Sequence, residues 1–235
     1  MFEPRQYVAD NGDVLNYRLL KPADYNPQDY DASKKYPLVV FLHGAGERGQ
    51  DNTAQLKHCL AEFCRPERRK AYPCYVLAPQ CPTGQKWVDL DWSQDEPAYP
   101  EAVSRPLELT LELVDSMLAD AAIDNRQVLI AGLSMGGYGT WDALLRRPKL
   151  FAAGIPICGG GDAARAAALT EIPIWCFHGE KDAVVPPQRS REMIDAIRAA
   201  GGSPRYTEYP GVQHDSWTRT FANDETFEWL FAQRK

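Results

Sequence analysis

The stretch "IAGLSMGGYG", residues 130–139, holds a single serine, Ser134, among four glycines. It contains the pattern G-x-S-x-G, in which the glycines leave room for a sharp, strained turn that lifts the serine hydroxyl clear of the backbone. An apolar run precedes the pattern and a helical pattern follows it, which is the strand–turn–helix context that a nucleophile needs. These features predict a reactive Ser134. The alternative is a glycine-rich turn whose serine caps the helix.

A serine hydroxyl is a weak nucleophile until a base takes its proton, and the chain offers four histidines: His43, His58, His178 and His214. The strand-to-helix turn implies the chain order serine, acid, histidine. Only His178 and His214 follow the serine, and only His214 comes late, in "GVQHDSW" beyond the last expected strand. We therefore predict that His214 is the base.

Four acids are candidates to orient the histidine ring and to stabilise its charged form. Asp182 ends "HGEKD", directly after an apolar run, which places it at the same sheet edge as the serine. Asp162 in "CGGGD" follows the preceding run and is its rival. Asp215 adjoins the histidine and is poorly placed to reach the ring, whereas a loop could also present Glu180. We predict Asp182.

Strands alternate with helices along most of the chain, which predicts a mostly parallel sheet with helices on both faces and sites at the carboxyl ends of its strands. An Asn-Gly pair between the first two strands predicts an antiparallel N-terminal hairpin. We expect one α/β domain, 1–235. Expected strands are 5–9, 14–20, 37–43, 74–78, 127–131, 151–157, 173–177 and 205–209, and expected helices are 53–63, 104–122, 135–146, 163–169, 187–199 and 224–233.

Five motifs in order, "FLHGAGERG", "APQCP", "GLSMGG", "FHGEKDAVVP" and "GVQHDSW", resemble those of the α/β-hydrolase fold. More narrowly, they resemble the compact phospholipase/carboxylesterase and dienelactone-hydrolase-like esterases, including predicted-peptidase-like relatives, from residue 37 to the end. In these enzymes "HGxxD" carries the triad aspartate, which matches Asp182, and the histidine matches His214. The resemblance implies an oxyanion hole made by the backbone N–H groups of Ala45 and Met135.

The resemblance also implies which residues line the site or support its loops. Arg48 is expected either to hold the "HGAGERG" loop in place or to bind a substrate carboxylate. Trp87 is a candidate substrate contact, and Trp92 and Trp217 are weaker candidates. His43 and His178 are expected to hold loops by hydrogen bonds. About fifteen residues separate strands 151–157 and 173–177, which leaves no room for a large cap, so the loop 82–106 is the best candidate for a partial wall.

Together these residues imply a serine carboxylic-ester hydrolase that acts through an acyl-enzyme. Its expected substrates are small-molecule or carbohydrate-linked esters, soluble or attached to a carrier, of short-chain, acetyl or feruloyl type. Alternatives on the same fold are a serine peptidase and an acyl-protein thioesterase. A non-catalytic binding protein is the alternative of another class, because the fold alone permits it.

The composition excludes other classes of protein. The 235 residues carry a formal net charge of −6, which gives no general attraction to nucleic acid. No run approaches the eighteen apolar residues of a spanning helix, so we expect no membrane insertion. The first residues lack the features of a signal peptide, which predicts a cytoplasmic location. The basic run 65–70, interrupted by Pro66 and Glu67, is expected to be a solvated loop.

Six cysteines are present, and we expect neither a metal site nor a cofactor. Cys158 and Cys176 lie at the end of, or within, apolar runs and are expected to be buried free thiols. The other four, at positions 59, 64, 74 and 81, are not at zinc-site spacings, and no histidine cluster joins them. A disulfide between two of these four remains open.

Overall fold

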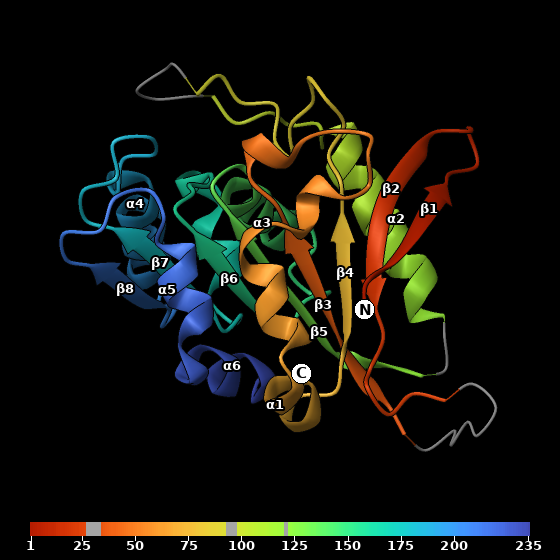
Figure 1. Ribbon diagram of the computed structural model, residues 1–235. Helices are drawn as coiled ribbons and strands as arrows, with labels where there is room; N and C mark the ends of the chain where they lie inside the picture. Colours follow the sequence, from red (N-terminus) through yellow and green to blue (C-terminus); the bar gives the residue numbers. More distant parts are fainter. Residues whose placement is uncertain (27–33, 93–97, 120–121) are drawn as a thin grey trace.

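The computed structural model describes residues 1–26, 34–92, 98–119 and 122–235. In this part of the chain, eight strands form one sheet in the order β1-β2-β4-β3-β5-β6-β7-β8 (Figure 1). The pairs β1–β2 and β2–β4 are antiparallel, and the other pairs are parallel. The strands are β1 (Glu3–Val8), β2 (Val14–Leu20), β3 (Tyr36–Leu42), β4 (Tyr75–Pro79), β5 (Ile123–Leu133), β6 (Ala153–Ile157), β7 (Trp175–Gly179) and β8 (Arg205–Tyr209).

Burial of the central strands on both faces explains their continuous apolar sequences. In β3, Leu38 and Val40 pack into the core on one face, whereas Val39 and Phe41 pack into the core on the other. The N-terminal hairpin pairs Val8 with Val14 and turns through Gly12 at φ +87°, a conformation that glycine adopts without strain. The predicted mostly parallel sheet with an antiparallel hairpin is confirmed.

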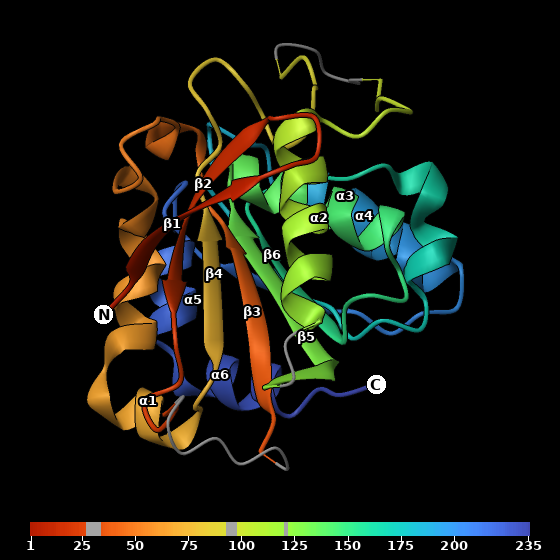
Figure 2. The same cartoon turned by 90° about the vertical axis from the view of Figure 1, so that its right-hand side faces the viewer.

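Helices cover both faces of this sheet (Figures 1 and 2). One layer contains α2 (Arg105–Leu118), α3 (Met135–Arg146) and α4 (Gln188–Ala199). The opposite layer contains α1 (Pro66–Ala71), α5 (Trp217–Ala222) and α6 (Asp224–Phe231). Within the described ranges there are four 3₁₀ segments: η1 (Ala45–Glu47), η2 (Ala54–Leu56), η3 (His58–Cys64) and η4 (Ala163–Leu169). The helix expected at 53–63 is therefore two 3₁₀ segments. Residues 120–121, at the end of the helix expected at 104–122, lie outside the description.

The basic run 65–70 is not a solvated loop, and that prediction is wrong. Most of it forms α1, with Pro66 at the first helical position, where its missing N–H costs nothing. The Arg68 guanidinium is buried, donates to the Phe221 carbonyl oxygen at 2.6 Å, and pairs with Glu62 and Asp224. A buried cation needs such partners, so Arg68 joins α1 to the start of α6.

The connection between β6 and β7, residues 158–174, is described throughout and contains one 3₁₀ helix, η4. As expected, no large cap is inserted there. The loop 82–106 rises above the carboxyl ends of the strands, but its residues 93–97 lie outside the description (Figure 1). Among the described residues, no helix has the length and apolar character needed to cross a bilayer.

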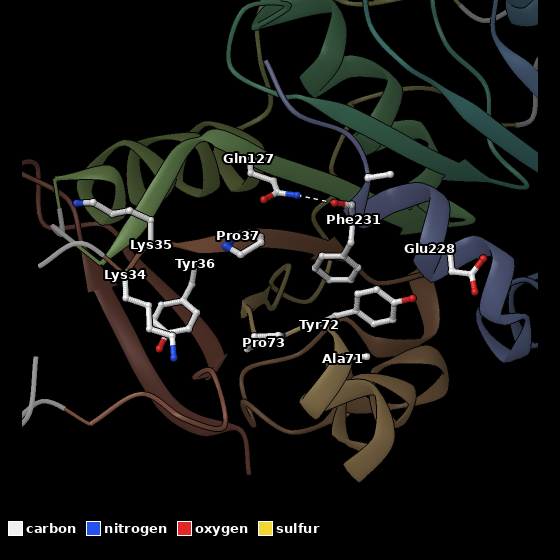
Figure 3. A pocket seen from close by; sticks show the side chains of 11 residues that line it. Lys34, Lys35, Tyr36, Pro37, Ala71, Tyr72, Pro73, Gln127, Glu228 and Phe231 are labelled. Carbon is white, nitrogen blue, oxygen red and sulfur yellow. Dashed lines mark hydrogen bonds between the residues drawn. The ribbon is translucent and has the colours of Figure 1, made fainter. Parts of the chain in front are cut away.

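A hollow of about 540 Å³ lies at the opposite, amino-terminal end of β3 (Figure 3). The rings of Tyr72 and Phe231 stack beside it at 4.8 Å, and Gln127 donates to the Phe231 carbonyl oxygen at 2.7 Å. Its remaining lining comes from the start of β3, the end of α1 and the C-terminal segment. The hollow is therefore separate from the carboxyl edge, where the sequence places the chemistry.

Candidate active site

Ser134 occupies a strained turn between β5 and α3, with φ 54° and ψ −117°. Glycines make this turn possible: a Cβ on Gly132 would lie 2.3 Å from the Gly136 carbonyl oxygen, and one on Gly136 would lie 1.9 Å from the Leu42 carbonyl oxygen. The serine side chain makes no capping hydrogen bond to α3. The hydroxyl is therefore presented away from the helix, and the capping alternative does not describe it.

A continuous chain of hydrogen bonds joins the three residues that the sequence singles out. The Ser134 Oγ lies 3.0 Å from His214 Nε2, and His214 Nδ1 lies 2.7 Å from Asp182 Oδ2. Since the carboxylate only accepts, Nδ1 carries the proton and donates, which leaves Nε2 free to accept from the serine hydroxyl. This tautomer is the one that a general base next to a serine requires.

The carboxylate of Asp182 is held in an anionic form by its surroundings. Its Oδ1 accepts from the backbone N–H groups of Val184 at 2.8 Å and Val185 at 2.9 Å. Burial raises the pKa of this carboxyl, but hydrogen bonds from His178, His214 and the two amides outweigh it and hold the pKa well below its usual range. A permanently ionised Asp182 stabilises a positive charge on His214.

His178 lies beneath the carboxylate, as the sequence suggests. Its Nε2 is 2.9 Å from the Val185 carbonyl oxygen and 3.3 Å from Asp182 Oδ2. Its Nδ1 is 2.7 Å from Ser190 Oγ, which in turn donates to the Gly159 carbonyl oxygen at 3.1 Å. The ring is fully buried, so it joins the loop after β7 to α4 and fixes the position of Asp182.

The other candidate acids are engaged elsewhere. Asp162 accepts from the Ala164 N–H at 3.1 Å and caps η4. Glu180 accepts from the Gly211 N–H, and Asp215 accepts from the Thr218 N–H at the start of α5. Of the four acids, all of which lie in the described part of the chain, only Asp182 is hydrogen-bonded to the His214 ring.

The loop that follows β3 runs beside the serine. A Cβ placed on Gly44 would lie 3.7 Å from the Ser134 Cβ, which puts the half-buried Ala45 next to the site. Arg48 Nε donates to the Ala45 carbonyl oxygen at 2.8 Å and so pins this loop. Met135 is the first residue of α3, where a backbone N–H has no partner within its own helix.

His43 holds the same loop from the inside. Its Nε2 accepts from the Cys81 N–H at 2.9 Å, so its Nδ1 carries the proton and donates to the Gly44 carbonyl oxygen at 2.6 Å. Burial lowers the pKa of His43 to about 4, which keeps the ring neutral. Trp87 donates its indole N–H to the His43 carbonyl oxygen at 3.0 Å and is itself fully buried. Trp87 therefore supports the loop and offers no surface to a substrate in this structure.

Three contacts around the site were not predicted from the sequence. The Trp217 ring packs edge-on against His214, with centroids 5.2 Å apart, and also against His58. His58 Nε2 lies 3.2 Å from the buried carboxylate of Glu47 in η1. The closeness of Trp217 to His214 in the sequence was the only feature that could have predicted their contact. No feature of the sequence could have predicted the contact of His58 with Glu47, because it forms only when the loop is folded.

Comparison with known proteins identifies the family to which this chain belongs. The family model described as Phospholipase/Carboxylesterase matches residues 30–227, which is most of the chain. The protein belongs to the phospholipase/carboxylesterase family. This assignment and the α/β-hydrolase fold agree with the resemblance carried by the five motifs. The chain is a carboxylesterase-type hydrolase.

Three relatives show the range of similarity to this carboxylesterase. A thermostable esterase superposes with a TM-score of 0.90 at 42% identity, over 100% of this chain and 63% of that one. A lysophospholipase-like protein 1 from Mus musculus is 24% identical, with 75% of this chain and 79% of the relative covered. A "probable inactive carboxylesterase" from Oryza sativa subsp. japonica is 25% identical, with 75% and 77% covered. The chain spans less than two thirds of the thermostable esterase.

We predict a pH dependence of stability that originates at His43. The pKa of an unfolded histidine is near 6.5, whereas that of His43 in the folded carboxylesterase is about 4, so the unfolded state binds the proton first. Stability is therefore greatest above pH 6.5 and falls as the pH drops toward 4. Between pH 7.5 and 4.5 the wild type should lose on the order of 2 kcal/mol more unfolding free energy than His43→Gln. Urea denaturation measures this, and parallel pH profiles would contradict it.

Proposed function

We propose that the protein is a serine carboxylic-ester hydrolase that acts through an acyl-enzyme, with Ser134 as nucleophile, His214 as base and Asp182 as the acid that orients it. The observation that carries the proposal is the unbroken hydrogen-bond chain from the Ser134 hydroxyl through both ring nitrogens of His214 to Asp182. In this series of hydrogen bonds, the serine hydroxyl can donate to Nε2 and Nδ1 can donate to the carboxylate. Nucleophilic attack requires this arrangement of protons.

The proposed reaction has two halves. Ser134 Oγ attacks the ester carbonyl carbon while its proton passes to His214 Nε2, and Asp182 stabilises the resulting imidazolium. The tetrahedral intermediate collapses as His214 returns the proton to the departing alcohol, which leaves an acyl group on Ser134. Water then gives a proton to His214 and attacks the acyl carbon, and the acid product leaves as the proton returns to Ser134 Oγ.

The negative oxygen of the tetrahedral intermediate is proposed to bind the backbone N–H groups of Ala45 and Met135. Two features support this role. Met135 begins α3, so its N–H lies at the positive end of a helix next to the serine. The loop of Ala45 is held rigidly by His43 inside and by Arg48 through the Ala45 carbonyl oxygen. We propose that Arg48 positions this donor loop, because its Nε is already committed there.

The proposed substrates are short-chain, acetyl or feruloyl esters, free in solution or attached to a carbohydrate. The connection between β6 and β7 supports this, because it carries no cap over the serine. Two relatives point the same way: a bifunctional acetylxylan esterase/xylanase from Neocallimastix patriciarum is 24% identical, and a "probable feruloyl esterase C" from Aspergillus niger is 23% identical. The chain spans 28% and 67% of these relatives, respectively.

Replacing the nucleophile tests the proposal. Ser134→Ala should lower kcat/KM for p-nitrophenyl acetate by about 10⁴-fold or more, because no other hydroxyl is hydrogen-bonded to His214 among the described residues. Circular dichroism should show an unchanged fold. The matching anilide should be cleaved only in trace amounts by the wild type. Ester turnover at the wild-type rate in Ser134→Ala would overturn the nucleophile, and efficient anilide cleavage would favour a peptidase instead.

A matched pair of variants tests the acid. Asp182→Asn should lower kcat for the same ester by on the order of 10⁴-fold, because an amide favours the wrong tautomer of His214. Asp162→Asn should have little effect on kcat, since the Asp162 carboxylate caps η4. Steady-state kinetics of the two purified variants decides the matter. A loss of activity confined to Asp162→Asn would show that the assignment of the acid is mistaken.

A further inference from the structure

A third polar side chain lies against the aspartate and histidine of the site. One ligand atom from each of Cys158, Asp182 and His214 lies within 4.8 Å of the others: the thiol sulfur, a carboxylate oxygen and a ring nitrogen. Cys158 follows β6 and has φ +41°, a left-handed conformation that is uncommon for a residue other than glycine. The mechanism described above makes no use of this thiol.

The Cys158 thiol is protonated in the metal-free protein, so a bound ion has to displace its proton. Burial raises the pKa of the thiol strongly and the nearby Asp182 carboxylate adds to this, whereas hydrogen bonds from the Ser134 backbone amide and the Ser216 hydroxyl offset it only in part. The Ser216 oxygen is fully buried and makes no regular hydrogen bond within the described chain. A buried hydroxyl beside a sulfur is an outer contact that a metal-bound thiolate accepts.

Sulfur, imidazole nitrogen and carboxylate oxygen together form a ligand set that suits zinc. Tetrahedral zinc keeps such ligand atoms about 3.3 to 3.7 Å apart. The His214 Nδ1 and Asp182 Oδ2 atoms are 2.7 Å apart and need to separate by about 0.6 Å, and the sulfur lies within 4.8 Å of both residues' ligand atoms. The His214 side chain is 21% exposed, whereas Asp182 and Cys158 are buried, so His214 is the one ligand of the three that contacts solvent.

We propose that Cys158, Asp182 and His214 form an inhibitory binding site for Zn²⁺. On binding, the ion replaces the proton of the Cys158 thiol, which passes to solvent, and the His214 proton moves from Nδ1 to Nε2 so that Nδ1 can ligate the ion; no atom is oxidised or reduced. A ring nitrogen of His214 then ligates the ion and the Asp182 carboxylate no longer orients the free imidazole. The inhibitory effect rests on the proposed esterase function, but the binding site does not.

Isothermal titration calorimetry with ZnCl₂ tests the site without any turnover. The Ser134→Ala protein keeps all three ligands, and we expect it to bind one Zn²⁺ per chain. Cys158→Ser in the same background should weaken the affinity at least about tenfold. Cys64→Ser is the matched control, since Cys64 is the exposed cysteine of the six, and it should leave the affinity unchanged. Co²⁺ should give a thiolate charge-transfer band that Cys158→Ser loses.

Inhibition is measured on the protein with its serine intact. Zn²⁺ should lower p-nitrophenyl acetate hydrolysis, and EDTA should restore it. Relative to its own zinc-free rate, Cys158→Ser should need at least about tenfold more Zn²⁺ for the same inhibition. If Cys158→Ser does not fold, His214→Asn takes its place in the calorimetry with the same expected loss of affinity.

Three results would overturn the proposal. Absence of Zn²⁺ binding to Ser134→Ala, or equal binding by Cys158→Ser, would show that the cluster is not a zinc site. Zn²⁺ bound at the cluster with ester hydrolysis unaffected would overturn its inhibitory role. A wild type that hydrolyses no ester would count against the proposed function alone, because the calorimetry still decides whether zinc binds.

Discussion

The backbone turn at Ser134 is the constraint on which the rest of the site depends. A residue at φ 54° is strained, so the surrounding structure has to hold it, and here close backbone contacts do so. Gly136 lies so near the Leu42 carbonyl oxygen that no side chain fits, which brings α3 directly against the end of β3. The same contact brings the start of α3, with Met135, close to the loop that follows β3.

A second set of contacts holds the Asp182 carboxylate and the His214 ring in place. Asp182 is fixed by two backbone amides from its own loop and by His178 below it, and His178 is tied to α4 through Ser190. The His214 ring rests edge-on against Trp217 at the start of α5. These contacts leave His214 Nε2 directed at the Ser134 hydroxyl. The short connection between β6 and β7 leaves the site without a large cap.

The sequence predicted the parts whose signals are local. The continuous apolar run of β3 and the Asn-Gly hairpin indicated the sheet, and motif order indicated Ser134, Asp182 and His214. Short elements were missed: α1 and α5 have six residues each, too few for a helical period to stand out. Full burial of Trp87 and the approach of Cys158 to the histidine also escaped prediction, because they arise only when loops far apart in sequence meet.

The most direct test of the account is to find which side chain reacts with an activated phosphorus electrophile. The wild type is treated with a fluorophosphonate probe and digested, and the modified peptide is sequenced by mass spectrometry. The hydrogen-bond chain to Asp182 should activate one hydroxyl, so we expect a single label on Ser134 and none on the Ser134→Ala protein. Label on another residue, or equal labelling of Ser134→Ala, would contradict the account.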